Sequence, residues 1–239
     1  VVDTQAPVMT CPADITTATT DPGLCYATAI TLGVPVTSDN CGVASVTNDA
    51  PAQYPVGTTT VTWSAIDVNG LSSTCTQKVT VADAEPPVIS CPANITGLAP
   101  DAGSCYASGV LLGSVAASDN CGIASVTNDA PAQFPIGTTT VTWTVTDNNG
   151  LKSTCTQTVQ VVDSEAPAIT CPSDITGAMP DAGKCYATGI ALGTPVTTDN
   201  CGIASVTNNA PAQYPIGTTV VTWTVTDNSG LTATCNQNV

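Results

Sequence analysis

The segment TTTVTWSAID (58–67) decides the fold class, because its apolar and polar residues alternate with a period of two. In an extended chain Val61 and Trp63 fall on one face, and the Thr and Ser residues between them fall on the other. The turn DVNG (67–70) follows, and Asp, Asn and Gly supply the backbone angles of a hairpin. The next stretch, LSSTCTQKVTVAD (71–83), therefore reads as its partner strand.

This hairpin recurs without gaps every 80 residues, as TTTVTWTVTD (138–147) and TTVVTWTVTD (218–227). The period predicts three tandem domains, at 1–82, 83–162 and 163–239. Both chain ends match the internal junctions, so we interpret the chain as a window of a longer array. Short junctions containing Pro favour a semi-rigid rod, about 110 Å long for three such domains.

Each 80-residue unit holds further short apolar runs between Gly- and Pro-rich turns. In the first unit, PVMTC (7–11), CYATAITL (25–32) and VASVTN (43–48) read as strands. No segment has helical periodicity. Several short strands at this spacing predict an all-β fold of tandem immunoglobulin-like β-sandwiches.

Composition excludes several classes of function. The chain has 18 acidic residues against 3 basic ones, a net charge of −15 and no His. Nucleic-acid binding needs a basic surface, and a His-dependent catalytic triad or His-ligated metal is impossible. No apolar run is long enough to cross a bilayer.

The cysteines recur in phase with the strands, four in each unit. A domain of 80 residues with one Trp has a thin core, so we expect two disulfides per unit, within that unit. Of three possible pairings, adjacent first and last strands favour Cys11 with Cys75. That leaves Cys25 with Cys41, joined by a chain reversal at Gly33. The twelve predicted disulfide cysteines are Cys11, Cys25, Cys41, Cys75, Cys91, Cys105, Cys121, Cys155, Cys171, Cys185, Cys201 and Cys235.

Zinc binding is the competing interpretation of the cysteines. Four zinc thiolates per unit are disfavoured, because no C-x-x-C pair occurs in the sequence. Twelve cysteines divided evenly among the units instead indicate an oxidising compartment, and we expect an extracellular or cell-surface location.

Acidic residues gather at the junctions between units. If the first strand of a domain runs parallel to its last, the Asp-x-x-Gly turn lies beside the acids of the preceding link. Such hard oxygen ligands suit a weak extracellular Ca²⁺ site. The alternative is that the acids are solvated and the Asp-x-x-Gly turn has no ligand-binding role. The first junction is expected to be weaker, because Gln5 replaces a Glu there. No other cofactor is expected, and the candidate ligands are Asp83, Glu85, Asp147, Asp163, Glu165 and Asp227.

Threonines form rows on the outer face of the same strands. Ordinary β-propensity explains them, and two functional interpretations compete with it: O-glycan attachment, or a hydroxyl array facing ice or a polysaccharide. The tryptophans sit on the apolar face, which favours core packing over sugar stacking. The candidate glycosylation sites are Thr58, Thr60, Thr62, Thr138, Thr140 and Thr142.

The motifs CPADIT (11–16), SDNCG (38–42), YPVGTTTVTW (54–63) and DVNG (67–70) resemble the hyalin repeat. The resemblance extends over the whole chain, three times. It implies immunoglobulin-like modules found in tandem in extracellular proteins, including bacterial surface proteins, with a role in adhesion or scaffolding. It also supports the Cys11–Cys75 pair, and it brings no catalytic residues.

These observations predict a non-catalytic structural protein: an extracellular fibre, stalk or adhesin. Acidic residues copied into every turn do not build a catalytic cleft, so no enzyme is expected. The predicted partners are other copies of the chain, or glycans and proteins of the cell surface or matrix, with no nucleic acid and no membrane span. The alternative is a carbohydrate-binding or spacer module of a larger secreted enzyme, which would need an exposed aromatic patch that breaks the repeat symmetry.

Overall fold

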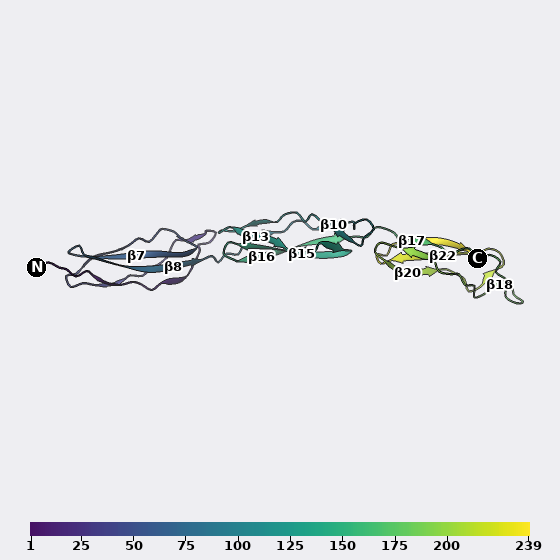
Figure 1. Cartoon of the computed structure of the whole chain (residues 1–239), viewed down its shortest axis with the longest axis horizontal. Helices are drawn as coiled ribbons and strands as arrows, with labels where there is room; N and C mark the ends of the chain where they lie inside the picture. The colour runs from purple at the N-terminus through teal and green to yellow at the C-terminus, as the bar shows by residue number, and fades with distance from the viewer. The chain divides into compact units, whose positions relative to one another are not determined.

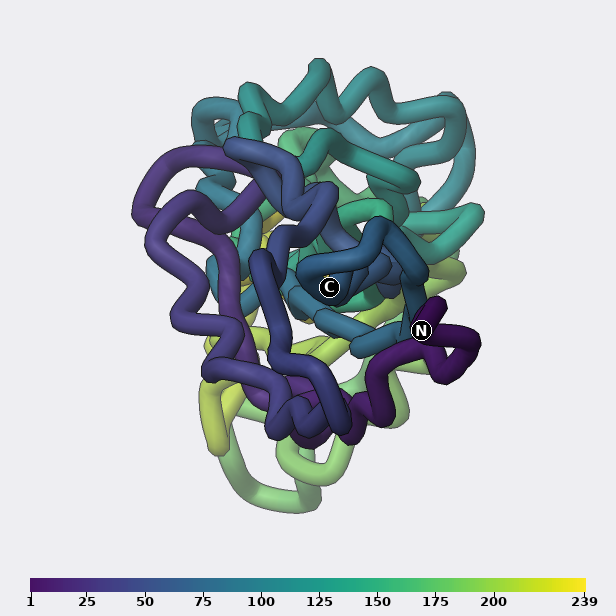
Figure 2. Tube along the Cα trace, turned by 90° about the vertical axis from the view of Figure 1, so that its left-hand side faces the viewer, coloured from purple at the N-terminus to yellow at the C-terminus, as the bar shows by residue number.

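The protein is built from β-strands and turns alone, as a computed structural model of all 239 residues shows (Figure 1). Figure 2 shows the Cα trace of the same chain as a tube, turned by 90° from Figure 1. No helix has the length and apolar character needed to cross a membrane. The predicted all-β fold of tandem β-sandwich repeats is confirmed.

The residues group into two compact units. The first consists of Val1–Pro92, Ser114–Asp129 and Thr142–Thr156, and the second of Ala93–Gly113, Ala130–Val141 and Gln157–Val239. The first unit thus contains the whole first repeat, the second contains the third repeat, and each holds part of the middle repeat.

The first repeat forms two layers. One layer is a four-stranded sheet in the order β2-β8-β7-β5, in which β2 runs parallel to β8 and the other pairs are antiparallel. The other layer holds the antiparallel pairs β1-β4 and β3-β6. The strands are β1 (Val8–Thr10), β2 (Ile15–Thr19), β3 (Tyr26–Ala27), β4 (Val36–Ser38), β5 (Val43–Asn48), β6 (Tyr54–Pro55), β7 (Gly57–Asp67) and β8 (Ser72–Ala82).

The other two repeats follow the same plan. The larger sheet of the middle repeat has four strands, in the order β10-β16-β15-β13. The larger sheet of the third repeat has three strands, in the order β20-β22-β23. The middle strands are β9 (Val88–Ser90), β10 (Ile95–Leu98), β11 (Tyr106–Ser108), β12 (Ala116–Ser118), β13 (Ile123–Asn128), β14 (Gln133–Pro135), β15 (Gly137–Asp147) and β16 (Lys152–Val161). Those of the third repeat are β17 (Ala168–Thr170), β18 (Tyr186–Ala187), β19 (Val196–Thr198), β20 (Ile203–Asn208), β21 (Tyr214–Pro215), β22 (Val220–Asp227) and β23 (Thr232–Asn238).

The core of the first repeat lies between its two layers, on the face that the alternation predicted. Val61 is fully buried and Trp63 is 6% exposed, and Val79 from β8 packs beside them. Ala27 and Tyr54 from the opposite layer close the core. The core role expected for the tryptophans is therefore confirmed, because their exposed fractions are only 6–7% in all three repeats.

A buried glutamine joins the two layers, and the sequence pattern did not single it out. The Gln77 side chain is 1% exposed and donates from Nε2 to the carbonyls of Ala13 (2.6 Å) and Leu32 (2.9 Å). Its Oε1 accepts a hydrogen bond from the Trp63 indole at 3.2 Å. Buried polar atoms need such partners, so this glutamine fixes both the Trp ring and two loops of the facing layer.

The predicted reversal at Gly33 is wrong. The chain from Tyr26 to Ser38 continues along the domain, because β3 pairs with β6 and β4 pairs with β1. Gly33 has a φ of +85°, and a Cβ there would lie 3.3 Å from Cβ of Pro12. A glycine is needed at this position because of its backbone angle and its close approach to Pro12.

The predicted Cys25–Cys41 disulfide is also wrong, because it depended on that reversal. Cys25 precedes β3, whose partner β6 lies at the Gly57 end of β7, whereas Cys41 precedes β5, which starts opposite Asp67. The 11 residues of β7 separate these two ends by about 33 Å. A disulfide needs Cα atoms within about 7 Å, so the two cysteines of one repeat cannot meet.

Candidate functional site: the joints between repeats

Disulfides join each repeat to the next. Cys25 bonds to Cys121 and Cys105 to Cys201, each with a Cα–Cα distance of 4.8 Å. The prediction that every bridge lies within one repeat is therefore wrong for this second set, including the pairs Cys105–Cys121 and Cys185–Cys201. Cys41 and Cys185 have no disulfide partner and are exposed.

The other set of disulfides lies within the repeats, as the sequence predicted. These three bridges connect the start of each domain to its last strand, with Cα–Cα distances of 5.7–5.8 Å. They are Cys11–Cys75, Cys91–Cys155 and Cys171–Cys235.

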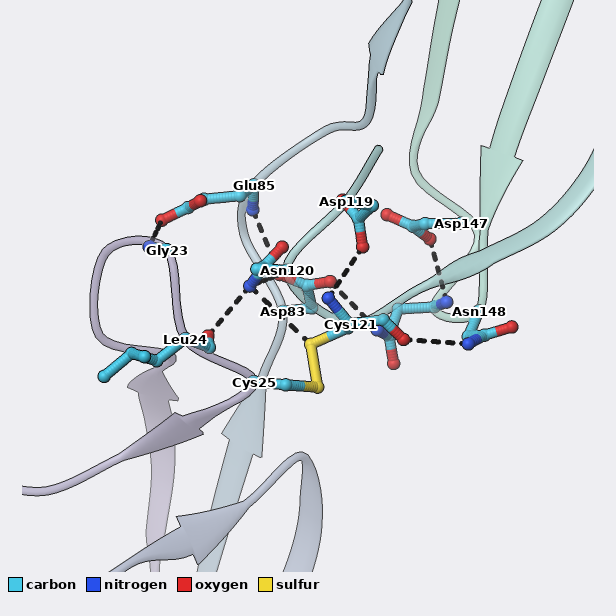
Figure 3. Close-up of a disulfide and its surroundings, with 11 residues drawn as sticks. Gly23, Leu24, Cys25, Asp83, Glu85, Asp119, Asn120, Cys121, Asp147 and Asn148 are labelled. Carbon is cyan, nitrogen blue, oxygen red and sulfur yellow. Dashed lines mark hydrogen bonds between the residues drawn. A yellow bond between two sulfur atoms is a disulfide. The ribbon is translucent and has the colours of Figure 1, made fainter. Parts of the chain in front are cut away.

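Hydrogen bonds surround the Cys25–Cys121 bridge, as Figure 3 shows. The Gly23 backbone N–H donates to the Glu85 carboxylate at 2.8 Å, and the Asn120 side-chain amide donates to the Leu24 carbonyl at 2.8 Å. The two residues that precede Cys25 are thus held by the second repeat. In the next joint, Asn200 donates in the same way to the Ser104 carbonyl at 3.1 Å.

The loop that carries Cys25 is a local turn fixed by its own sequence. The Asp21 N–H donates to the Tyr26 carbonyl (2.9 Å), and the Leu24 N–H donates to the Asp21 carbonyl (3.0 Å). The Asp21 carboxylate accepts from the Thr28 hydroxyl at 2.6 Å, which ties down the far side of the turn. Gly23 lies at a φ of +72°, where a glycine is favoured.

Three aspartates meet at the start of every repeat. In each set, one carboxylate oxygen from every residue lies within 4.8 Å of the other two. One Asp comes from the link, one from the loop before the cysteine of the joint, and one from the Asp-x-x-Gly turn. We call these sets the Asp triads: Asp3, Asp39 and Asp67; Asp83, Asp119 and Asp147; Asp163, Asp199 and Asp227.

The oxygens of the middle triad are unequally satisfied. Oδ1 of Asp147, a residue only 1% exposed, accepts the N–H groups of Asn149 (2.8 Å) and Leu151 (2.9 Å), which builds the turn. Its Oδ2 is buried without a hydrogen-bond partner, and so are Oδ2 of Asp119 and Oδ1 of Asn120. The other triads repeat the pattern, because Oδ2 of Asp39, Asp67, Asp199 and Asp227 is also buried and unpartnered.

At the start of the first repeat, two pKa values are displaced. The Gln5 backbone N–H, with the amides of Asn40 and Asn69, holds the pKa of Asp3 below its ordinary value of 3.8. The neighbouring Asp3 carboxylate raises the pKa of the Cys41 thiol above its ordinary value of 9.0, first by hydrogen bonding. The Asp3 carboxyl therefore stays ionised to lower pH than usual, and the Cys41 thiol keeps its proton to higher pH.

The predicted calcium ligands are partly brought together. Asp83 lies with Asp147, and Asp163 lies with Asp227, as the sequence predicted. Glu85 instead binds Gly23 of the preceding repeat, and neither Glu85 nor Glu165 belongs to a triad. Their place is taken by Asp119 and Asp199, which the sequence interpretation missed because each lies 36 residues along the chain from the acid of its link.

The first repeat therefore has a complete triad. The expectation that its site is weaker rested on Gln5, which stands where the later repeats have Glu. That position is not part of the triad, and Asp3, Asp39 and Asp67 repeat the arrangement of the later ones. The recurring SDNCG and TDNCG segments carry the missed signal, since an Asp stands two residues before each cysteine.

The candidate threonines lie on the solvent side of their sheets. Thr58, Thr60, Thr138 and Thr140 are exposed, and Thr62 and Thr142 are half-buried. O-glycan attachment at these positions stays a prediction. Thr58 also shares a hydrogen bond of 3.0 Å with Thr80 on the neighbouring strand, in keeping with ordinary sheet pairing.

Comparison with known proteins identifies the family. Residues 2–81, 82–161 and 162–239 each match the HYR domain. The chain belongs to the HYR domain family. The resemblance of this HYR chain to the hyalin repeat is thereby confirmed, and the match to the family extends over residues 2–239.

Two curated relatives of these HYR repeats are hyalins. The chain is 35% identical over 243 residues to hyalin from Strongylocentrotus purpuratus, covering 96% of this chain and 20% of that protein. It is 32% identical to hyalin from Lytechinus variegatus, with 96% and 45% coverage. The HYR chain thus spans less than half the length of either hyalin.

One solved structure found in the comparison is the protocadherin gammaB7 EC3-6 cis-dimer. The match covers 98% of this chain and 73% of that one, with 14% identity and a TM-score of 0.40.

Proposed function

We propose that these HYR repeats form a load-bearing segment of an extracellular fibre, stalk or adhesin, with domains at 1–82, 83–162 and 163–239. The observation that carries the proposal is the covalent joint. A bond such as Cys25–Cys121 restrains the angle between successive repeats, which a flexible linker does not do. Ligand binding within a single repeat would not require the repeats to be fastened to each other.

The rest of the surface supports a structural role. The large apolar side chains that are exposed are not aromatic, and they include Val34 (81%), Leu111 (92%) and Met179 (81%). Carbohydrate-binding modules rely on exposed aromatic rings, and the aromatic core residues here are buried. The disulfides support an extracellular role, because such bonds persist in an oxidising compartment. The spacer of a secreted enzyme remains the second candidate, distinguished by a catalytic domain in flanking sequence.

Small-angle scattering tests the structural role. We expect the Cys41→Ser/Cys185→Ser variant, which removes both free thiols, to scatter as a stiff rod about 110 Å long. Adding Cys25→Ser and Cys121→Ser should broaden the distance distribution, because one joint then bends more freely. A compact particle, or a joint equally stiff without its disulfide, would contradict the proposal.

We further propose that each Asp triad binds Ca²⁺ and stiffens the start of its repeat. The support is the set of buried carboxylate oxygens without donors, such as Oδ2 of Asp119 and of Asp147. Unpartnered buried charge is strongly unfavourable, and three neighbouring carboxylates also repel one another. A hard divalent cation satisfies these oxygens, and millimolar extracellular calcium suffices for weak sites.

Calorimetric titration with CaCl₂ tests this binding. The three triads predict three sites per chain, with dissociation constants of about 10⁻⁴ to 10⁻³ M. Asp119→Asn/Asp147→Asn should remove one site, since Asn keeps the turn acceptor but not the charge. Glu85→Gln is the matched control, and it should keep all three sites because Glu85 lies outside the triad.

Thermal unfolding distinguishes calcium binding from a structural effect, because the difference in melting temperature between variant and wild type should change sign with Ca²⁺. With a chelator, Asp119→Asn/Asp147→Asn should melt at a higher temperature than the wild type, because it relieves repulsion. With millimolar Ca²⁺ the order should reverse. Identical wild-type melting curves under both conditions would refute the calcium proposal and leave the structural role intact.

A further inference from the structure

Two of the Asp-x-x-Gly turns contain an Asn followed directly by Gly. Asn149 precedes Gly150 in the turn between β15 and β16, and Asn69 precedes Gly70 in the turn between β7 and β8. No other Asn of the chain is followed by Gly, and the third repeat has Ser229 at this position. Such a pair is reactive, because the next backbone nitrogen can attack the side-chain amide and Gly offers no side chain to block the approach.

Both pairs are open to solvent. Asn149 and Gly150 are exposed, and apart from its chain neighbours no atom lies within 4 Å of the point where a Cβ of residue 150 would stand. The Gly150 N–H donates to the Asp147 carbonyl at 3.3 Å, longer than the usual distance of about 2.9–3.0 Å. Gly70 donates to the Asp67 carbonyl at the same distance. Only a weak hydrogen bond therefore has to break before the Gly nitrogen turns toward the amide.

The same side chains hold the aspartates of the links. In each repeat, the residue before the Gly of the turn donates to Oδ2 of the link Asp at 2.9–3.0 Å. The donor and acceptor pairs are Asn69 with Asp3, Asn149 with Asp83, and Ser229 with Asp163. A hydroxyl makes this contact as well as an amide does, so the third repeat has the contact without the reactive group.

We propose that Asn69 and Asn149 are sites of spontaneous conversion to aspartyl and isoaspartyl residues, a modification that breaks their contact with the link Asp. The substrate is the amide of the protein itself, and water is the only co-reactant. The inference goes beyond the structural role and the calcium sites proposed above, and it rests on neither.

The reaction at Asn149 has two steps. The Gly150 nitrogen loses its proton and bonds to Cγ of Asn149, while the Cγ–Nδ2 bond breaks and Nδ2 takes up a proton to leave as ammonia. One water then opens the cyclic imide. Cleavage of the new N–Cγ bond gives an aspartyl residue, and cleavage of the original peptide bond gives an isoaspartyl residue. Either product carries a carboxylate where the amide stood.

The product reverses the contact with the link. Oδ2 of Asp83 loses the Asn149 amide, while its Oδ1 keeps the Glu85 N–H at 3.2 Å and the Asn120 amide at 3.3 Å. The new carboxylate also stands beside Asp83, and neighbouring like charges repel. Conversion therefore loosens the hold of the turn on the link in the first two repeats and leaves the third unchanged.

Peptide mapping by mass spectrometry tests the reaction in the folded chain, after incubation in mildly alkaline buffer at physiological temperature. We expect conversion at Asn149 and Asn69, and none at Asn148, an exposed residue of the same turn that is not followed by Gly. Asn149→Ser should abolish conversion at its own position and leave that of Asn69 unchanged. Conversion of Asn149 and Asn69 no faster than that of Asn148 would overturn the proposal.

Ser229→Asn is the gain-of-function test. It places an Asn before Gly230, whose N–H donates to the Asp227 carbonyl at 3.3 Å as in the other turns. Position 229 should then convert at a rate close to that of Asn149. Ser229→Gln is the matched control and should stay unmodified, because its longer side chain forms the cyclic imide much more slowly. An Asn at position 229 that stays intact would refute the role given to the turn.

Hydrogen exchange of the Glu85 amide tests the effect on the link, in the presence of a chelator so that no calcium is involved. Asn149→Asp imitates the aspartyl product and should raise this exchange about fivefold, as expected for the loss of one hydrogen bond. Asn149→Ser is the matched control and should exchange like the wild type, because a Ser donor serves the third repeat at 3.0 Å. Equal exchange in the two variants would contradict the loosening of the link.

Discussion

The interior of a repeat and the joint between repeats use the same elements, a disulfide with supporting side-chain amides, to different ends. Inside, Cys11–Cys75 lies beside the core, and Gln77 is 1% exposed. In the joint, Cys25–Cys121 connects an exposed turn to the next repeat, and Asn120 makes the hydrogen bonds. The interior is complete in one repeat, whereas the joint needs two.

This difference implies that folding and connection are separable. A change in the interior should unfold one repeat, and a change in the joint should leave both neighbouring repeats folded. Each of the following predictions applies this distinction to a particular residue.

The largest effect is expected from the interior disulfide of the third repeat. Cys171→Ser/Cys235→Ser should lower the free energy of unfolding of that repeat by about 4 kcal/mol, because the bridge closes a long loop of the unfolded chain. Denaturant titration with hydrogen exchange resolved by repeat measures it. Cys185→Ser, which breaks no bond, is the control. An unchanged third repeat in the double variant would contradict the stapling role.

The next largest effect concerns the buried glutamine. Gln237→Leu should destabilise the third repeat by about 2–3 kcal/mol, since it leaves the Trp223 indole and the carbonyls of Ser173 and Leu192 without partners. Urea unfolding followed by Trp fluorescence measures the loss. Gln213→Leu is the exposed control and should have little effect. Equal losses for both variants would show that the layer-to-layer network is unimportant.

A joint variant should act differently. In Cys25→Ser/Cys121→Ser, we expect exchange of the backbone amides around Gly23 and Leu24 to rise at least tenfold, with protection of β7 and β8 unchanged. The reason is that the bridge orders a surface turn and carries no part of the core. Hydrogen exchange with mass spectrometry measures both regions. Loss of protection in β7 would show that joint and interior are one cooperative unit.

The smallest effect is a pH dependence at the edge of the interior. Side-chain and backbone hydrogen bonds from Asn238 hold the pKa of Asp174 below its ordinary value of 3.8. This contribution to stability is therefore present above pH 3.8 and is lost as the pH falls through the lower, folded-state pKa.

Carboxyl NMR titration of Asp174 checks the direction of that shift. Acid unfolding of Asp174→Ala against the wild type should show a slightly smaller dependence on pH. The middle repeat offers an internal control, because Asn94 stands at the position of Asp174 and does not titrate. Its side-chain oxygen accepts a hydrogen bond from the Thr158 N–H at 2.9 Å. A titration of Asp174 at or above 3.8 would contradict the prediction.

Local pattern was enough to predict most of each domain. Alternation placed Val61 and Trp63 in the core, and the Asp-x-x-Gly turn placed β7 beside β8. These features depend on neighbours in sequence, because side chains of a strand alternate between its faces and a short turn pairs the strands on either side. The Cys11–Cys75 pair followed instead from the expected adjacency of the first and last strands, with support from the resemblance to the hyalin repeat.

Features that depend on a free sheet edge or on a neighbouring strand could not be predicted from the local sequence pattern. β2 exists because Ile15, Ala18 and Thr19 find the free edge of β8 at Val79, Val81 and Ala82. A backbone segment with little apolar content becomes a strand only where another strand supplies donors and acceptors.

The joint shows most clearly where sequence reasoning stops. A repeat of constant length gives each cysteine only a position within the 80-residue period. Cys41 and Cys121 have the same position in that period, so the sequence does not show which of them pairs with Cys25. Only the path of the chain separates them, because β7 holds the two cysteines of one repeat at opposite ends of the domain and brings those of successive repeats to 4.8 Å between Cα atoms. The Asp triads follow from that path too, since Asp119 reaches Asp83 through the loop that ends at the bridged Cys121.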